Sequence, residues 1–370
     1  MPYDAPTNGN AHSLGSGECD LKLTCTPHSC KNNGGIRLRS MGQAMVQFLF
    51  RLLVIFVFLT CPVIAQGSST REKVVIAQFG KEKFLLYLPL YIAMDEGLFA
   101  KQGLEVDLRF AGNDDQIFAT VMSGSAQFGV GDPVFAAISR EKGGPGKVIA
   151  LMASKLGISG YTKRDAVPMI IGPQDAAGLR IGSLPAPSTT YTLLREFVQR
   201  NNLETTRLVQ VAIGAQLAAL EAGQVDIAVE LEPAVSVAES KGYRVNFPFE
   251  RFTEPQAITG LSTLESTIQQ RPELVQKVVS ALQDGLNLLH SDGDAALRTG
   301  EKLFPNLPKE VVARAVKRIV DCGIHPRTAV VEDVLWQRSL RTRLESGELK
   351  RPQSVDVTVD NRFALAASRG

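Results

Sequence analysis

Between Val74 and Phe249 the sequence alternates short apolar runs with segments of helical pattern. Each apolar run ends in a polar or glycine turn, and a helical segment opens directly after it, as where Ala126–Val130 precedes Gly131-Asp132-Pro133. Strands that alternate with helices predict βαβ units and a parallel sheet. The carboxyl ends of parallel strands and the N-termini of the helices meet at one edge of such a sheet, where ligands bind. We therefore expect the functional residues in these turns.

The patterns form two strand–helix sets followed by a mainly helical region. The expected strands are Val74–Gln78, Glu105–Phe110, Gln127–Val130, Val148–Ala153, Pro168–Ile171, Leu179–Gly182, Leu208–Val211, Asp226–Glu230 and Arg244–Phe249. The expected helices are Pro89–Ala100, Asp114–Ser123, Pro133–Glu141, Thr189–Gln199, Ala215–Glu221, Ala234–Ser240, Pro272–Leu289, Ala295–Phe304, Glu310–Val320 and Val331–Leu344.

Two sets of this kind predict an α/β protein with two lobes. The polar segment 159–165 has the composition of a crossing between the lobes, and Arg244–Phe249 has that of a return. Lobe 1 is then discontinuous, built from residues 71–160 and 246–350, and lobe 2 covers residues 161–245. Residues 351–370 form a tail. A cleft between the lobes is the expected place for a small ligand, with closure about a hinge.

Residues 41–65 have the pattern of a secretory signal peptide. Arg51 opens the apolar stretch Leu52–Leu59, and Val63-Ile64-Ala65 fits the small-residue rule for cleavage before Gln66. Lipid attachment at Cys61 and a retained membrane anchor are the alternatives. Residues 1–40 have loop composition and are interpreted as a leader or a mis-assigned start. We therefore expect an exported protein in a periplasmic or other extracytoplasmic space.

Charge and cysteine content limit the function classes. The chain has 40 Lys and Arg and 38 Asp and Glu; five and three of these precede residue 66, which leaves 35 of each sign after it. A neutral mature chain argues against nucleic-acid binding. Only Cys322 lies beyond the signal segment, so no intrachain disulfide is expected. The irregular spacing of Cys19, Cys25 and Cys30 argues against a metal site. We expect a monomer without cofactor or metal.

Two turns of the first set carry acids at the start of a helix. Asn113 and Gln116 have the spacing of a capping box, and Asp114 favours the positive end of the helix dipole. Asp132, before Pro133, suits an N-cap. Capping explains these residues completely. Ligand contact is a second interpretation, because the loop after a parallel strand faces the cleft.

Polar groups also follow the strands of the second set. Ser188, Thr189 and Thr190 open a helix after two prolines, and three hydroxyl groups exceed the need of one cap. With backbone N–H groups they suit an oxyanion or a polar heterocycle. Glu230 and Glu232 follow another strand and suit a ligand amine, although Glu232 could instead cap the helix that begins at Ala234.

Aromatic residues surround the first turn, and catalytic residue types are scarce. Phe79 and Tyr87 could stack on a flat ligand, or pack in the core. His290 and His325 are the only histidines after residue 65, and no Ser lies in a Gly-x-Ser-x-Gly elbow. We therefore expect a binding protein, not an enzyme.

Three segments resemble one protein family. Residues 91–106, Tyr-Ile-Ala-Met-Asp-Glu-Gly-Leu-Phe-Ala-Lys-Gln-Gly-Leu-Glu-Val, resemble the opening of ABC-importer solute-binding proteins. The branch is the one that handles nitrate, sulfonates, taurine and thiamine pyrimidine precursors. Residues 123–132, and residues 219–228 with the following Glu232-Pro233, resemble its second and third signatures. The resemblance extends in order over about residues 72–300.

The resemblance implies the type II periplasmic-binding-protein fold, here with a helical C-terminal extension. It also implies an ABC permease and an ATPase as partners. By resemblance, the ligand contacts fall near Phe79, Asn113 and Asp114, Asp132, Ser188 to Thr190, and Glu230 to Glu232.

The expected cleft is rich in acids, and no arginine lies within these turns. Bare nitrate or sulfonate would be better held by Arg or Lys. The residues therefore favour a small nitrogen-bearing organic ligand of the thiamine-pyrimidine kind, delivered to an ABC importer. Sulfonate, taurine or nitrate binding remains an alternative. A pyrimidine-processing enzyme and a membrane-anchored sensor on the same fold are further alternatives.

Overall fold

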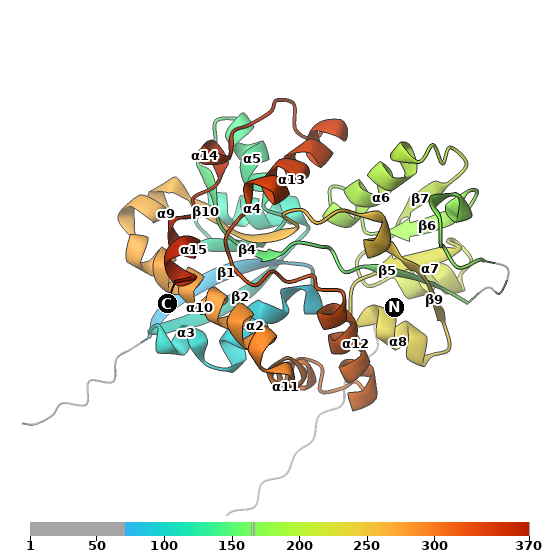
Figure 1. The fold of residues 1–370 in the computed structure, drawn as a ribbon, viewed down its shortest axis with the longest axis horizontal. Coiled ribbons are helices and arrows are strands. Elements are labelled where there is room, and N and C mark those ends of the chain that lie inside the picture. The colour runs from blue at the N-terminus through green and yellow to red at the C-terminus, as the bar shows by residue number, and fades with distance from the viewer. Residues whose placement is uncertain (1–70, 164, 166, 370) are drawn as a thin grey trace, which may run out of the picture. The chain divides into compact units, whose positions relative to one another are not determined.

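A computed structural model describes residues 71–163, 165 and 167–369. The expected leader, residues 1–40, and signal peptide, residues 41–65, lie outside the described residues. The described chain contains two five-stranded sheets (Figure 1). The first has the order β2-β1-β3-β10-β4, formed by β1 (Glu72–Phe79), β2 (Leu104–Gly112), β3 (Phe128–Gly131), β4 (Gly146–Ala153) and β10 (Thr259–Leu264). The second has the order β7-β6-β8-β5-β9, formed by β5 (Ser159–Thr162), β6 (Arg180–Ser183), β7 (Arg207–Gln210), β8 (Ile227–Glu230) and β9 (Arg244–Pro248).

The two sheets follow one plan. In the first, β1 is parallel to β2 and β3, and β10 is inserted antiparallel between β3 and β4. In the second, β6 is parallel to β7 and β8, and β5 is inserted antiparallel between β8 and β9. After β4 the chain crosses to the second sheet, and after β9 it returns to the first sheet as β10. This confirms the expected α/β class with the periplasmic-binding-protein fold.

Helices fill the connections of both sheets and the C-terminal region (Figure 1). Those of the first sheet are η1 (Leu85–Tyr87), α2 (Leu88–Asp95), α3 (Leu98–Lys101), α4 (Asp114–Met122) and α5 (Val134–Glu141). Those of the second are η2 (Pro173–Ala176), α6 (Thr189–Arg200), α7 (Gln216–Glu221), α8 (Ala234–Ser240) and η3 (Phe249–Phe252). After β10 follow α9 (Glu265–Gln270), α10 (Pro272–Ser291), α11 (Gly293–Leu303), α12 (Lys309–Asp321), α13 (Asp333–Glu345), α14 (Val355–Thr358) and α15 (Arg362–Ala367). None of the described helices is long and apolar enough to span a membrane.

Two segments, 154–158 and 249–258, connect the sheets, and they run side by side. The Gln256 N–H donates to the Ser154 carbonyl at 2.8 Å, and the Ile258 N–H donates to the Ala153 carbonyl at 3.1 Å. A paired crossing of this kind can act as a hinge, because a few backbone torsions there change the angle between two packed units.

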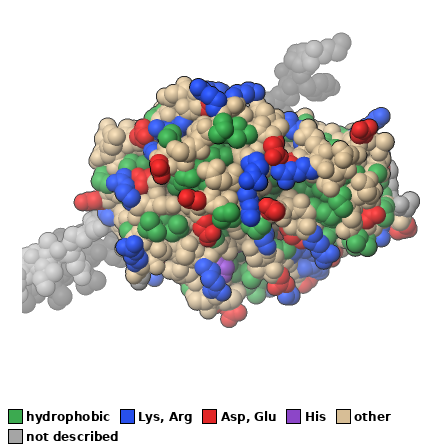
Figure 2. Space-filling model, turned by 45° about the horizontal axis from the view of Figure 1, so that its top comes forward, with side chains coloured by type: hydrophobic (Ala, Val, Ile, Leu, Met, Phe, Trp, Pro, Cys, Tyr) green, Lys and Arg blue, Asp and Glu red, His purple; other side chains and the backbone are tan. Residues whose placement is uncertain are grey.

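The C-terminal helix α13 is anchored on the first sheet. Trp336 is fully buried in a cluster with Phe135, Val148 and Leu151. Its indole N–H donates to the Thr358 hydroxyl at 3.0 Å, which also fastens α14. We therefore treat α13 as moving with the first sheet. On the face seen in Figure 2, basic and acidic side chains are interspersed, in line with their balanced number.

Four expectations for individual elements are wrong. Residues 159–162, expected in a crossing between the lobes, form β5 of the second sheet, because they pair with β8 on one side and β9 on the other. Residues 168–171 form no strand, because the N–H groups of Ile171 and Gly172 donate to the Asp175 carboxylate at 2.9 and 2.8 Å in a turn. The expected helix 89–100 is broken at Gly97, whose φ of 68° lies in the left-handed region. The strand β10 was not expected, because Gly260, Ser262 and Thr263 interrupt its apolar pattern.

Candidate ligand-binding cleft

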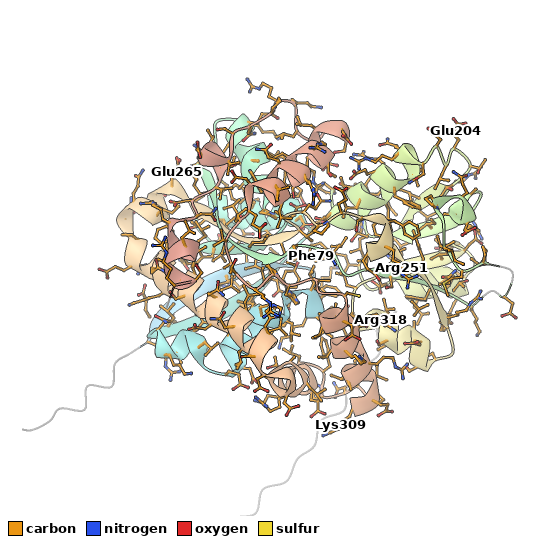
Figure 3. The ribbon with its side chains drawn as sticks, viewed as in Figure 1. Phe79, Glu204, Arg251, Glu265, Lys309 and Arg318 are labelled. Atoms are coloured by element: carbon orange, nitrogen blue, oxygen red, sulfur yellow. The ribbon has the colours of Figure 1, made fainter. Side chains whose placement is uncertain are left out.

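Side chains of both sheets enclose a small cavity at the carboxyl ends of the parallel strands. Its lining consists of Phe79, Leu86, Tyr87, Asp114, Asp132, Leu156, Leu184, Ser188, Thr189, Thr190, Leu231, Ile258 and Thr259. Figure 3 labels Phe79 in this region, between the two sheets. The cavity measures about 20 Å³, which holds roughly one water molecule. The cleft is therefore closed, and an organic ligand could enter only after the two sheets move apart.

Asp114 and Asp132 form the polar side of the cavity that belongs to the first sheet. Asp114 is 6% exposed, and one of its carboxylate oxygens accepts from the Asp132 N–H at 3.1 Å. Asp132 caps α5, since its Oδ1 accepts from the Val134 N–H at 2.9 Å. Gly131 makes this approach possible: a Cβ there would lie 2.4 Å from the Ile117 side chain and 3.1 Å from Asp114 Oδ1.

Thr189 connects this acid pair to the second sheet. Its hydroxyl donates to Asp132 Oδ2 at 2.6 Å, and its N–H lies 3.4 Å from Asp114 Oδ2. Ser188 is the N-cap of α6, with its hydroxyl oxygen accepting from the Tyr191 N–H at 3.3 Å. Thr190 is 2% exposed and lines the cavity without a side-chain hydrogen bond within the described chain. Its hydroxyl is therefore available to a ligand.

Arg343 of α13 completes this polar cluster and was not expected from the sequence. Its guanidinium is 2% exposed and forms an ion pair and a hydrogen bond with Asp132 Oδ2. It also donates to the Thr192 hydroxyl of α6 at 2.6 Å and pairs with Glu348. The expectation of a cleft without arginine is therefore corrected. No local motif marks Arg343, which follows Asp132 by 211 residues in an amphipathic helix.

Burial changes the acid–base chemistry of the cleft. Desolvation, followed by the charge of Asp132, raises the pKa of Asp114 to about 7. Asp114 can thus donate or accept a hydrogen bond near neutral pH. Desolvation, together with the nearby Asp114, also raises the pKa of Tyr87 well above its ordinary value, so this phenol stays protonated.

Three expected residues lie outside the cavity lining. Asn113 caps α4 by accepting from the Asp114 N–H at 2.9 Å, and its amide donates across the cleft to the Pro185 carbonyl at 3.3 Å. The Gln116 side chain completes the capping box by accepting from the Asn113 N–H at 2.8 Å. Asn113 therefore contributes to a contact between the sheets.

The two glutamates that follow β8 have different surroundings. Glu232 is 1% exposed; its carboxylate accepts from the Ser236 N–H at 3.0 Å, which caps α8, and pairs with Arg318. Figure 3 labels Arg318 on α12, which packs against α8. Glu230, at the end of β8, is buried without an ion-pair partner among the described residues, and desolvation, then Glu82, raises its pKa to about 8.

The aromatic residues divide between cleft and core. Phe79 and Tyr87 line the cavity, whereas Tyr91 is buried behind them and accepts from the Gln78 amide at 2.7 Å. Among the described residues no group of three His, Cys, Asp or Glu side chains is arranged to hold a metal ion. The cavity thus combines apolar walls with one polar end.

Known proteins share this architecture. A curated relative, the riboflavin-binding protein RibY of Chloroflexus aurantiacus, is 24% identical over 299 residues, which cover 76% of this chain and 83% of RibY. The periplasmic aliphatic sulphonate binding protein SsuA of Escherichia coli has a TM-score of 0.62 at 14% identity, covering 78% of this chain and 92% of SsuA. The desulfurization enzyme DSZB has a TM-score of 0.55 at 15% identity, covering 81% of this chain and 99% of DSZB. These structures show that binding proteins and at least one enzyme share the fold.

The family model described as "NMT1/THI5 like" matches residues 86–296. This range includes the first and second sheets from η1 to β10, together with Asp114, Asp132 and residues 188–190 of the cleft. The protein therefore belongs to the NMT1/THI5-like family.

Proposed function

We propose that this protein captures a small nitrogen-bearing organic ligand between two lobes, residues 71–160 with 246–350 and residues 161–245, and delivers it to an ABC importer. The observation that carries the proposal is the cavity itself. Hydrogen-bonding groups of both sheets meet there between aromatic and leucine side chains. Apolar walls with a few convergent polar groups are typical of small-molecule sites.

The charges of the cleft favour an uncharged ligand. The positive charge of Arg343 neutralises Asp132. The Asp114 carboxyl is only partly ionised near neutral pH, because its pKa is raised to about 7. A ring with neighbouring N–H and C=O groups could exchange hydrogen bonds with Asp114 and with the free hydroxyl of Thr190. Oxopyrimidines and the flavin ring carry such an edge, and an aminopyrimidine presents an equivalent donor and acceptor through its amino group and the neighbouring ring nitrogen. The name of the relative RibY agrees with this chemistry, so we include riboflavin with the thiamine-pyrimidine class.

A bare anion fits the cleft less well. The cavity lining contains no Arg, Lys or His, and the guanidinium of Arg343 behind it is already bound by Asp132, Glu348 and Thr192. Nitrate or a sulfonate would therefore enter a site that offers two carboxylates and no free cation. Anions need charged or well-oriented donors to offset the loss of their hydration.

Export is the second part of the proposal. It rests on the signal-peptide pattern of residues 41–65 and on the periplasmic location named for SsuA. A permease and an ATPase are the partners that an importer would supply. N-terminal sequencing of the protein recovered from the periplasm tests cleavage before Gln66. A product that retains Arg51 would support an anchored form instead.

A thermal-shift screen tests the ligand class. The protein recovered from the periplasm is melted with riboflavin, thiamine pyrimidine precursors, free pyrimidines, taurine, alkanesulfonates and nitrate. A ligand at about 100 times its Kd raises the free energy of unfolding by roughly 2.7 kcal/mol. We expect a shift with a pyrimidine or flavin. A shift with taurine, a sulfonate or nitrate alone would refute the proposed ligand class, and no shift with any compound would refute capture of these ligands.

A further inference from the structure

One buried arginine joins the two lobes at the cleft. Arg343 pairs with Asp132 of the first sheet and donates to the Thr192 hydroxyl of α6 at 2.6 Å. Its guanidinium also lies over the Phe135 ring, 5.6 Å from the centroid. Because α13 is anchored on the first sheet by Trp336, the contact with Thr192 forms only when the lobes are closed.

The loop after α13 forms a second polar connection to α6. Glu348 accepts from the Thr192 hydroxyl at 2.9 Å and from the Arg195 guanidinium at 3.0 Å, and both donors belong to α6. Arg343 pairs with Glu348 as well. The C-terminal region therefore contributes a polar interface with α6 that is separate from the ligand contacts.

Closure changes the surroundings of Asp132. In the closed cleft it is 8% exposed and lies beneath Thr189, next to Asp114. In an opened cleft, water would replace the Thr189 contact. Burying a carboxylate without a positive partner costs several kcal/mol. Arg343 removes most of this cost, because it belongs to the same lobe as Asp132 and stays beside it throughout.

We propose that Arg343 is a positioning residue that lets the cleft close with no charged ligand in it, by neutralising Asp132 where closure removes this carboxylate from water. The inference deepens the proposed function, since an uncharged ligand could not neutralise Asp132 by itself. Closure of the empty cleft can be measured without any ligand. A failed ligand screen would therefore refute the proposed ligand class without deciding the role of Arg343, which the ligand-free experiment below tests separately.

The charged groups around Arg343 determine what its loss would do. Asp132 and Asp114 face it from the first sheet, Glu348 from the C-terminal loop and Glu196 from α6. Arg195 faces Glu348, and Tyr87 faces Asp114. Without Arg343 the two aspartates would lie together beneath Thr189 with no cation. Closure would then require a proton on this pair, and it would weaken as the pH rises.

Hydrogen exchange reads closure directly. The Leu85 N–H donates to the Glu232 carbonyl at 2.9 Å, a bond between the two lobes that contacts no residue of the Arg343 cluster. Its protection therefore reports closure and not a local change at α13. The amides of β1 within the first sheet serve as the internal reference for global folding.

The full-length protein, without ligand, is compared with its Arg343→Met variant at pH 6 and pH 8 after correction for intrinsic exchange rates. In the unsubstituted protein we expect Leu85 protection to fall by no more than about tenfold in total between pH 6 and pH 8, because only the Asp114 carboxyl, with its pKa of about 7, loses a proton there. In Arg343→Met it should fall about tenfold per pH unit, as expected when closure takes up one proton. Arg343→Lys should restore part of the protection at pH 8. Arg341→Met is the control on the same helix, since the Arg341 side chain of α13 is exposed and forms no hydrogen bond or ion pair within the described residues.

As long as Arg343→Met is folded, two results would overturn the inference: equal Leu85 protection in Arg343→Met and the unsubstituted protein at pH 8, or an unprotected Leu85 amide in the unsubstituted protein. If Arg343→Met also loses protection in β1, it has unfolded, and the double variant Asp132→Asn/Arg343→Met decides. Recovery of β1 and Leu85 protection at both pH values would support charge neutralisation. A double variant that stays unfolded would assign Arg343 to packing and overturn the inference.

Discussion

Replacing Asp114 with Asn tests whether burial holds a proton in the cleft. The two side chains have nearly the same size. The Asn oxygen can still accept from the Asp132 N–H, which lies 3.1 Å from Asp114 Oδ1 in the unsubstituted protein. The amide cannot accept from Thr189 as well, so the variant should lose about 1–3 kcal/mol at every pH. The informative quantity is therefore how this difference changes with pH.

The magnitude follows from the raised pKa of Asp114, about 7 against the ordinary 3.8. Between these values the folded protein binds more protons than the unfolded chain, so this carboxyl stabilises the fold at low pH, and that stability is lost as pH rises through 7. At pH 5, two units below 7, the contribution is about 2–3 kcal/mol, and at pH 8 it is close to zero. The stability of the Asn variant relative to the wild type should therefore improve by about 2–3 kcal/mol between pH 5 and pH 8.

Urea unfolding of both proteins at pH 5, 6, 7 and 8 measures this difference. His325 also titrates, because burial lowers its pKa to about 4, and its effect has the opposite sign. It is present in both proteins and cancels in the comparison, provided that the two sites are independent. Two curves that stay parallel from pH 5 to pH 8 would show that Asp114 is ionised throughout, and would refute the reasoning from burial.

The remaining predictions separate ligand contacts from structural ones. Thr190→Val should weaken ligand binding about fivefold to tenfold and change the Tm little, as seen by titration and melting, because this hydroxyl has no hydrogen-bond partner among the described residues; a lowered Tm with unchanged affinity would assign Thr190 to the fold. Glu232→Ala should lower the free energy of unfolding by about 1–3 kcal/mol, since it removes a cap and one of the two carboxylates that pair with Arg318, which keeps Glu239, with affinity nearly unchanged; loss of affinity alone in a titration would place Glu232 at the ligand. Gly131→Ala should cost about 1–3 kcal/mol in urea unfolding and also reduce affinity, because its Cβ displaces Asp114, and wild-type values of both would contradict the close packing.

The architecture could be predicted where local pattern and tertiary structure agree. Alternation of apolar runs and helical segments located the parallel strands of both sheets, such as β1 and β8. The inserted strands β5 and β10 were not predicted, because each is polar or glycine-rich and is stabilised by pairing on both of its sides. Strands of this kind depend on partners that are distant in the sequence, and no local pattern reports such partners.

The same distinction applies to the cleft. Asp114, Asp132 and Ser188 to Thr190 lie together because they follow parallel strands, which the strand–turn–helix rhythm predicts. Arg343 could not be assigned, since α13 shows only the pattern of a surface helix. The sequence left open whether Glu232 caps a helix or meets a ligand, and only the contacts with Ser236 and Arg318 show how its carboxylate is used.

The buried arginine also changes the reason for expecting a nitrogen-bearing ligand. Counted along the sequence, the acids of the cleft suggest a ligand with a positive charge. In the structure Asp132 is neutralised by Arg343, Glu232 by Arg318, and Asp114 holds a proton for part of the time at neutral pH. The cavity would then attract a cation only weakly. An anion would meet no positively charged side chain in the cavity lining. The proposed selection would then depend on shape and on hydrogen bonds with Asp114 and Thr190, which is the reason for proposing an uncharged heterocycle.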